Sequence, residues 1–168
     1  MPFAGGGLIR VLDCLICSLR MRDKTDSTSS LLGRPWLFPA AYLLHIVEET
    51  RGVGVPHGFN LSLAQFFVYS GAAWALLVVG VVLGRKFGFS QFIQVCLGSV
   101  FLVNGFSHLI KSARIAGYDA GVITGTLIFI PLGALTLFAL WNAMARRRYF
   151  VGMALGVLIQ AVATILSK

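Results

Sequence analysis

Four long runs of apolar residues occupy most of the chain. They cover residues 62–83, 90–110, 121–144 and 149–166, and none of them contains Asp, Glu, Lys or Arg. A helix that crosses the hydrocarbon core of a bilayer needs about 20 mainly apolar residues. The pattern therefore predicts four membrane-spanning helices joined by short loops.

A fifth and shorter run covers residues 35–49. Only 13 positions precede Glu48 and Glu49, so this run spans a membrane only if it carries both carboxylates into the outer part of the bilayer. We expect it to do so. The predicted fold is an all-α membrane protein, a bundle of five transmembrane helices over residues 35–168, preceded by a short cytoplasmic head over residues 1–34.

Small residues and one proline add packing detail to these helices. Glycines four residues apart predict faces on which two helices approach closely, and the pairs are Gly80 with Gly84, Gly121 with Gly125, and Gly152 with Gly156. Pro131 lacks a backbone donor and predicts a kink in the 121–144 helix.

The composition agrees with the membrane class. Apolar residues make up 57% of the chain and charged residues 12%, whereas soluble domains are about 45–50% apolar and about 25% charged. These values exclude a disordered chain, a coiled coil and a secreted disulfide scaffold. We expect membrane lipid as the surroundings and no nucleic-acid partner; the sequence leaves the oligomeric state open.

Lysine and arginine fall mainly on one side of the predicted bundle. Of the 14 such residues, ten lie in the head and in the loops 84–89 and 145–148, and four lie on the other side. Cytoplasmic loops carry the excess of positive charge. This distribution predicts a cytoplasmic N-terminus and an extracytoplasmic C-terminus.

The head permits two interpretations. Residues 8–19 are apolar but interrupted by Arg10 and Asp13, which is typical of a flexible or interfacial segment rather than a span. Alternatively, translation begins at Met21, since residues 21–30 read as a polar leader before the first span.

Polar side chains gather at the predicted outer ends of three helices. His45 shares a helix face with Glu48 and Glu49, because residues three and four apart are neighbours on a helix. Asn104 and His108 form a second pair of this kind. Tyr118, Asp119 and Thr124 stand where the 121–144 helix begins. Because successive spans alternate in direction, all of these residues are expected at one membrane level, and ionisable groups inside membranes mark functional sites.

This order of residues resembles the HXXEE-motif family of small membrane proteins, whose pattern is H-x-x-E-E, a later histidine and Y-x-P-G. The matching positions are His45-x-x-Glu48-Glu49, His108 and Tyr118-Asp119-Ala120-Gly121, and the resemblance covers residues 35 to about 145. One departure is Ala120, which stands where the family has proline. The family is of uncharacterised function, so the resemblance implies a membrane-associated site and no particular reaction.

A transition-metal site is the sharpest hypothesis for this group. Two imidazoles and two carboxylates are sufficient ligands for Zn²⁺ or Fe²⁺. By analogy with the zinc-peptidase string H-x-x-E-H, the expected ligands are His45, Glu49 and His108, and the expected general base is Glu48, acting on a water bound to the metal.

The identity of the bound metal would determine the class of reaction. Zinc predicts hydrolysis of a lipid or lipid-linked substrate that enters from the outer leaflet, and iron predicts an oxidative reaction. Asn104 or Tyr118 would orient a ligand or stabilise an oxyanion. His57, in the loop 50–61, is a further candidate loop ligand.

Two other interpretations remain open. The cluster can be an interhelical polar contact that holds three helices in register. It can also be part of a proton- or cation-coupled carrier. The carrier interpretation needs a polar path through the inner halves of the spans, where the sequence offers little beyond Gln91, Gln94 and Asn142.

Overall fold

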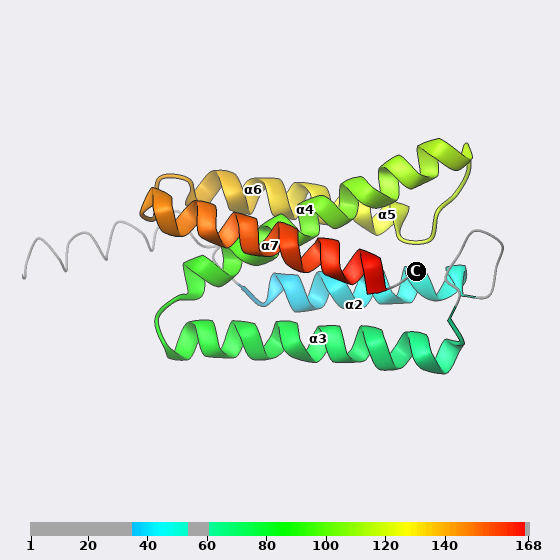
Figure 1. The fold of residues 1–168 in the computed structure, drawn as a ribbon, viewed down its shortest axis with the longest axis horizontal. Coiled ribbons are helices and arrows are strands. Elements are labelled where there is room, and N and C mark those ends of the chain that lie inside the picture. The colour runs from blue at the N-terminus through cyan, green and yellow to red at the C-terminus, as the bar shows by residue number, and fades with distance from the viewer. Residues whose placement is uncertain (1–34, 54–60, 167–168) are drawn as a thin grey trace, which may run out of the picture. The chain divides into compact units, whose positions relative to one another are not determined.

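The structure is a computed structural model that describes residues 35–53 and 61–166. All of these residues belong to the unit Pro35–Lys168. The predictions for the head over residues 1–34 and for His57 therefore lie outside the described residues. Every element that the described residues form is a helix (Figure 1), which confirms the all-helical prediction.

The helices follow the predicted apolar runs closely. In chain order they are α2 (Leu37–Glu49), the short 3₁₀ turn η1 (Thr50–Gly52), α3 (Leu63–Lys86), α4 (Ser90–Ile115), α5 (Val122–Thr124), the π-helical turn η2 (Gly125–Phe129), α6 (Ile130–Leu140) and α7 (Arg146–Leu166). The segments α5, η2 and α6 form one continuous helical stretch over Val122–Leu140.

Four of these stretches are long and apolar enough to cross a membrane: α3, α4, Val122–Leu140 and α7. Their outward surfaces are also apolar, with Leu76 72%, Leu127 70% and Phe138 83% exposed. Apolar side chains this exposed fit a hydrocarbon surrounding better than water. The described residues thus have the character of a multi-pass membrane protein.

The fifth predicted span is not confirmed. Helix α2 has 13 residues, and at 1.5 Å per residue this corresponds to about 20 Å, against a hydrocarbon core of about 30 Å. It begins and ends close to the predicted limits, but its length does not meet the requirement for crossing a bilayer by itself.

Local sequence signals explain where α3 begins and ends. At its start Ser62 accepts a hydrogen bond from the Gln65 N–H, and the Gln65 side chain accepts one from the Ser62 N–H, which is a capping box. At its end Gly88 has a φ of +73°, and the Phe89 N–H donates to the carbonyl of Gly84. This is a Schellman ending, which favours glycine.

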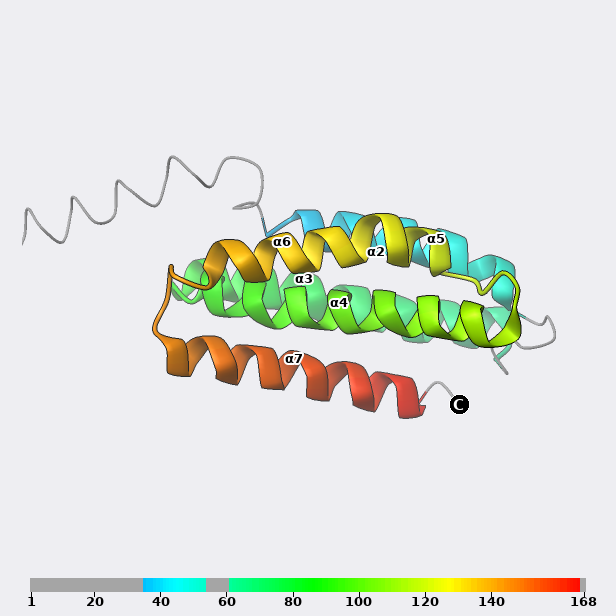
Figure 2. The same cartoon turned by 90° about the horizontal axis from the view of Figure 1, so that it is seen from above.

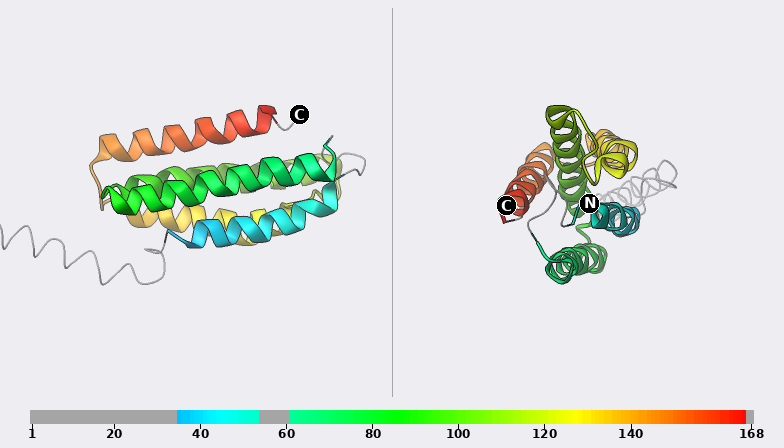
Figure 3. Two further views of the ribbon diagram at one scale, coloured as in Figure 1. Left: turned by 90° about the horizontal axis from the view of Figure 1, so that it is seen from below. Right: turned by 90° about the vertical axis from the view of Figure 1, so that its right-hand side faces the viewer.

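Helix α4 lies at the centre of the bundle. It contacts α3, α6, α7 and the segment α5–η2, and it runs between α6 and α7 in Figure 2 and amid the other helices in the end view of Figure 3. Two crossings of α4 depend on glycine. A Cβ at Gly133 would lie 2.6 Å from the carbonyl oxygen of Gly98, and a Cβ at Gly105 would lie 2.6 Å from that of Gly125.

The predicted glycine pairs differ in their surroundings. Gly152 and Gly156 of α7 face α4 closely, and Gly156 is packed against the carbonyl of Cys96. At Gly80 of α3, in contrast, an added Cβ would meet no atom of the described residues within 4 Å. The spacing of small residues therefore indicates a helix contact correctly in α7 and does not indicate one at Gly80.

The π-helical turn η2 occupies the region where Pro131 predicts a kink. Proline cannot donate to the carbonyl four residues earlier, and the regular α-helical pattern is replaced by η2 just before it. Such turns are rare and occur frequently at functional sites. This one begins directly after Thr124, which is part of the polar cluster described next.

Candidate metal centre

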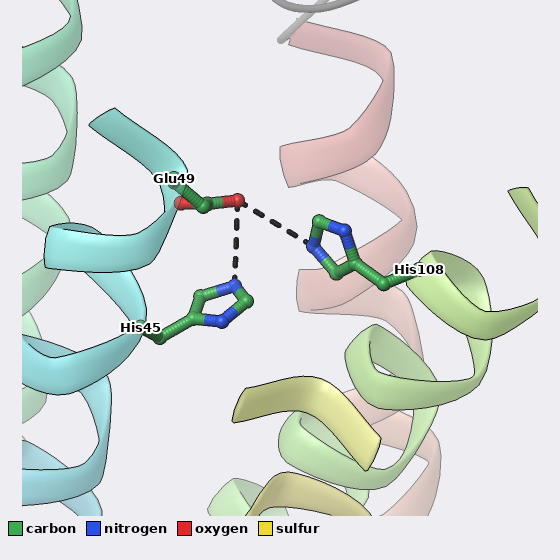
Figure 4. Close-up of side chains that lie close together, drawn as sticks. All are labelled: His45, Glu49 and His108. Atoms are coloured by element: carbon green, nitrogen blue, oxygen red, sulfur yellow. Dashed lines mark ion pairs between the residues drawn. The ribbon is translucent and has the colours of Figure 1, made fainter. Parts of the chain in front are cut away.

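The last turn of α2 and the second half of α4 bring three ligand-type side chains together. Oε1 of Glu49 lies 3.3 Å from Nε2 of His45 and 3.4 Å from Nε2 of His108. The three ligand atoms all lie within 4.8 Å of one another. Figure 4 shows the carboxylate of Glu49 pointing between the two imidazoles, one from each helix.

The two separations from Glu49 to the histidines match edges of a metal tetrahedron. Bonds of about 2.1 Å from Zn²⁺ to nitrogen and oxygen place neighbouring ligand atoms about 3.4 Å apart. A charge-assisted hydrogen bond between a histidine and a carboxylate is shorter, about 2.7–2.9 Å. The distances from Glu49 to both histidines therefore fit a shared cation better than two direct hydrogen bonds.

Nε2 of His45 is a buried polar atom without a hydrogen-bond partner among the described residues. The His45 side chain has no exposed surface, and those of Glu49 and His108 are 12% exposed. A buried nitrogen that faces a carboxylate oxygen at 3.3 Å without a hydrogen bond to it is costly. A cation between the three side chains would satisfy it.

The other nitrogen of His45 is held by Thr124. Nδ1 of His45 lies 2.7 Å from Oγ1 of Thr124, and the Thr124 hydroxyl donates to Oε2 of Glu48 at 2.5 Å. The ring of His45 also packs on Phe129, with centroids 4.4 Å apart. The imidazole is thus fixed on one edge by a hydroxyl and on one face by an aromatic ring.

His108 has a matching arrangement with a carboxylate. Its Nδ1 donates to Oδ2 of Asp119 at 2.7 Å, and Oδ1 of Asp119 accepts from Nζ of Lys111 at 2.6 Å. Histidines that bind metals usually donate their second N–H to a carboxylate or carbonyl, which orients the ring. In the neutral tautomer that donates from Nδ1 to Asp119, Nε2 of His108 presents its lone pair to Glu49.

Glu48 points to the start of α5 instead of to the three ligands. Its carboxylate accepts four hydrogen bonds: from the Tyr118 hydroxyl at 2.9 Å, from the N–H of Ile123 at 2.9 Å, and from both the N–H and the hydroxyl of Thr124. These bonds join the end of α2 to the start of α5. Burial and the bond to Glu48 raise the pKa of the Tyr118 hydroxyl, so it remains a donor.

Gly121 makes room for both imidazoles. Its φ of +100° and ψ of −9° match the third position of a type II turn, closed by the Val122 N–H donating to the carbonyl of Asp119 at 3.0 Å. A Cβ on Gly121 would lie 2.7 Å from Cε1 of both His45 and His108. Ala120 occupies the second position, where proline is favoured, and the turn forms without it.

The structure thus sorts the predicted site residues into three groups. His45, Glu49 and His108 converge, as the metal hypothesis expects. Glu48 and Tyr118 bond to each other beside that group, so the predicted catalytic role of either remains a prediction. Asn104 lies about one turn before His108 on α4, and its side chain makes no hydrogen bond to another described residue.

The sequence gives no individual role to Thr124 or Asp119. It places them only at the membrane level of the other site residues. In the structure Thr124 contacts His45, and Asp119 contacts His108. The sequence signal is their place beside the Tyr118 motif at a helix start. Which nitrogen each of them contacts depends on the packing of α2 and α4.

A family model described as "protein of unknown function with HXXEE motif" matches residues 36–138. All three converging residues, and the partners of both histidines, lie inside the matched region. This agrees with the resemblance found from the motif. No solved structure matches the chain.

Proposed function

The chain belongs to the family of proteins of unknown function with an HXXEE motif, and we propose that it binds one transition-metal ion, Zn²⁺ or Fe²⁺, in a membrane. The ligands are His45, Glu49 and His108. The observation that carries the proposal is the convergence of three ligand atoms, with a buried Nε2 on His45 that makes no hydrogen bond to the described residues. Three electron-rich atoms in such proximity need positive charge between them.

Protons on the imidazoles are the competing source of that charge. They would form short charge-assisted bonds to Glu49, whereas the separations are 3.3 and 3.4 Å. An imidazole that donates from Nδ1 can be neutral or protonated at Nε2 as well, so the two separations are the observation that favours a metal ion.

Three protein ligands leave a coordination position for a substrate or water, as in catalytic zinc sites. We therefore propose a metal-dependent membrane enzyme, with hydrolysis of a lipid or lipid-linked substrate as its reaction if the ion is zinc. Zinc would supply a Lewis acid. Leu44 and Val47, on the same helix as two ligands, are apolar and 57% and 65% exposed, which supports an approach from the lipid side.

The remaining site residues receive different roles in this proposal. Glu48 is a positioning residue, because four donors already occupy its carboxylate. Asn104 is the candidate for substrate contact, because it lies on the helix of His108 and its side chain makes no hydrogen bond to the described residues. Tyr118 acts through Glu48.

The test is the metal content of detergent-purified full chain, with His45→Ala and His108→Ala beside the wild type. Asn104→Ala is the matched control on α4. We expect about one equivalent of zinc or iron in the wild type and the control, and loss in both histidine variants. A metal-free wild type that is well folded would refute the proposal. Zinc-loaded protein would then be screened with phospholipid and lipid-linked substrates against His108→Ala.

For topology we propose that α2 enters the membrane as a fifth helix, and that the metal site lies at the extracytoplasmic face with the N-terminus in the cytoplasm. The distribution of Lys and Arg supports this orientation. A membrane-impermeant thiol reagent on intact cells should label Gly117→Cys and spare Ala145→Cys. The reverse pattern would invert the orientation without affecting the metal proposal.

A structural polar cluster is the second candidate function. The four hydrogen bonds of Glu48 tie α2 to α5, and this observation favours it independently of a metal. In that case His45→Ala and His108→Ala would lower thermal stability in the presence of a chelator as much as in the presence of zinc. A metal site predicts a difference between the two conditions.

A further inference from the structure

The Thr124 hydroxyl lies between the histidine and the first glutamate of the HXXEE motif. Its Oγ1 lies 2.7 Å from Nδ1 of His45 and 2.5 Å from Oε2 of Glu48. Both of these residues belong to α2, whereas Thr124 ends α5. One hydroxyl from a distant part of the chain therefore links two side chains of the same helix.

The direction of these hydrogen bonds follows from counting donors. A threonine hydroxyl has one hydrogen, and an ionised carboxylate only accepts. The carbonyl of Gly121 is 3.5 Å away and Nδ1 of His45, which could accept in its other tautomer, is 2.7 Å away. The oxygen of Glu48 is nearer, at 2.5 Å, so we assign the hydrogen to Glu48. The hydroxyl oxygen then accepts from Nδ1–H of His45. In a neutral imidazole this leaves Nε2 without a proton, facing Glu49 and His108.

We propose that Thr124 is a positioning residue of the metal site: its hydroxyl, oriented by Glu48, fixes the Nδ1–H tautomer of His45 and keeps the Nε2 lone pair on the metal. This inference rests on the proposed metal-binding function. The proposal assigns different roles to the adjacent residues Glu48 and Glu49. Glu49 is a ligand, and Glu48 acts on His45 through Thr124.

The surroundings of His45 make this control effective. The imidazole is fully buried and packs on Phe129, so water has no access with which to replace the hydroxyl. Outer partners of metal-bound histidines typically contribute 10–100-fold, in order of magnitude, to metal affinity. We expect the Thr124 hydroxyl to contribute in about that range.

The experiment compares zinc affinity in Thr124→Val, Thr124→Ser and Thr126→Val, measured by chelator competition on full-length protein in detergent. Valine keeps the shape and the backbone N–H bond to Glu48 but removes the hydroxyl; serine retains it. Thr126 is the matched control, because its buried hydroxyl has no hydrogen-bond partner among the described residues. We expect Thr124→Val to weaken zinc binding about 10–100-fold, with the other two variants close to wild type.

A Thr124→Val protein that binds zinc as the wild type does would overturn the inference. Loss of affinity in Thr126→Val equal to that in Thr124→Val would also overturn it, because the effect would then be one of packing. Absorption of the Co²⁺-loaded proteins gives a second readout, since the ligand field should change in Thr124→Val and be restored in Thr124→Ser.

A measurement without metal separates this inference from the metal proposal. The chain has three histidines, so ¹⁵N-histidine labelling with a His45→Gln variant assigns the His45 signals, at mildly alkaline pH. We expect the Nδ1–H tautomer in the wild type and its loss in Thr124→Val. If the wild type binds no zinc, the proposed metal-binding function fails. The tautomer of His45 in the metal-free protein then decides by itself whether Thr124 orients this histidine. An Nε2–H tautomer in the wild type would overturn the inference whether or not a variant folds. An Nδ1–H tautomer that persists in folded Thr124→Val would also overturn it.

Discussion

Gly121→Ala is expected to disrupt the metal centre although the residue binds nothing itself. Gly121 adopts a φ of +100°, which side chains other than glycine rarely tolerate. Its added Cβ would lie 2.7 Å from Cε1 of His45 and 2.7 Å from Cε1 of His108. One methyl group therefore acts on the backbone turn and on both imidazoles at once.

The size of the effect follows from these contacts. Non-bonded carbon atoms prefer separations of about 3.5 Å or more, so each ring must retreat by about 0.8 Å. Metal–ligand distances tolerate only about 0.2 Å of deviation. The strained backbone costs about 1–3 kcal/mol and the overpacking a further 1–3 kcal/mol, approximately. We expect the free energy of unfolding to fall by about 2–6 kcal/mol and zinc affinity to fall at least about 100-fold.

Thermal unfolding in detergent, with zinc and with a chelator, measures the first effect, and chelator competition measures the second. Gly80→Ala is the matched control, because a Cβ there meets nothing within 4 Å among the described residues. In the middle of α3 it should raise stability by about 0.5–1 kcal/mol and leave zinc binding unchanged. A Gly121→Ala protein with wild-type stability and zinc affinity would refute the geometry on which the site is built.

Four further outcomes are expected. Glu48→Gln places an amide group among four donors, so metal-free stability should fall by about 1.5–3 kcal/mol; unchanged thermal unfolding would contradict the anchoring of α5 by this carboxylate. Asp119→Asn weakens the orientation of His108, and zinc affinity by chelator competition should fall about 10–100-fold, whereas equal affinity would show that this carboxylate has no part in the site. Ala120→Pro fits the second position of the type II turn and should raise the thermal stability by about 0.4–1 kcal/mol; destabilisation would indicate a different turn. Zinc affinity should fall as the pH is lowered, by up to about 100-fold per pH unit where both imidazoles take up protons, because protons compete with the metal for two nitrogen ligands; a pH-independent affinity would exclude histidine ligands.

The fold is predictable where local signals are strong. Charge-free apolar runs locate α3, α4 and α7 to within a few residues, because exclusion of charge from hydrocarbon acts on each segment separately. The capping box at Ser62 and Gln65 marks a helix start in the same local way. The length of α2 shows the limit of this reasoning, since an apolar run ending in two carboxylates fits both a short buried helix and a span.

The spacing of residues along the chain is enough to place His45 and Glu49 on one face of a helix, because a separation of four residues does so wherever the helix lies. The alternation of the helices likewise brings His108 and Tyr118 to the same end of the bundle. Helix packing, in contrast, turns Glu48 to α5, brings Thr124 and Asp119 to the two histidines, and fits Gly121 between the rings. These contacts depend on the rotation and axial register of packed helices, and small differences in either change which nitrogen meets which oxygen.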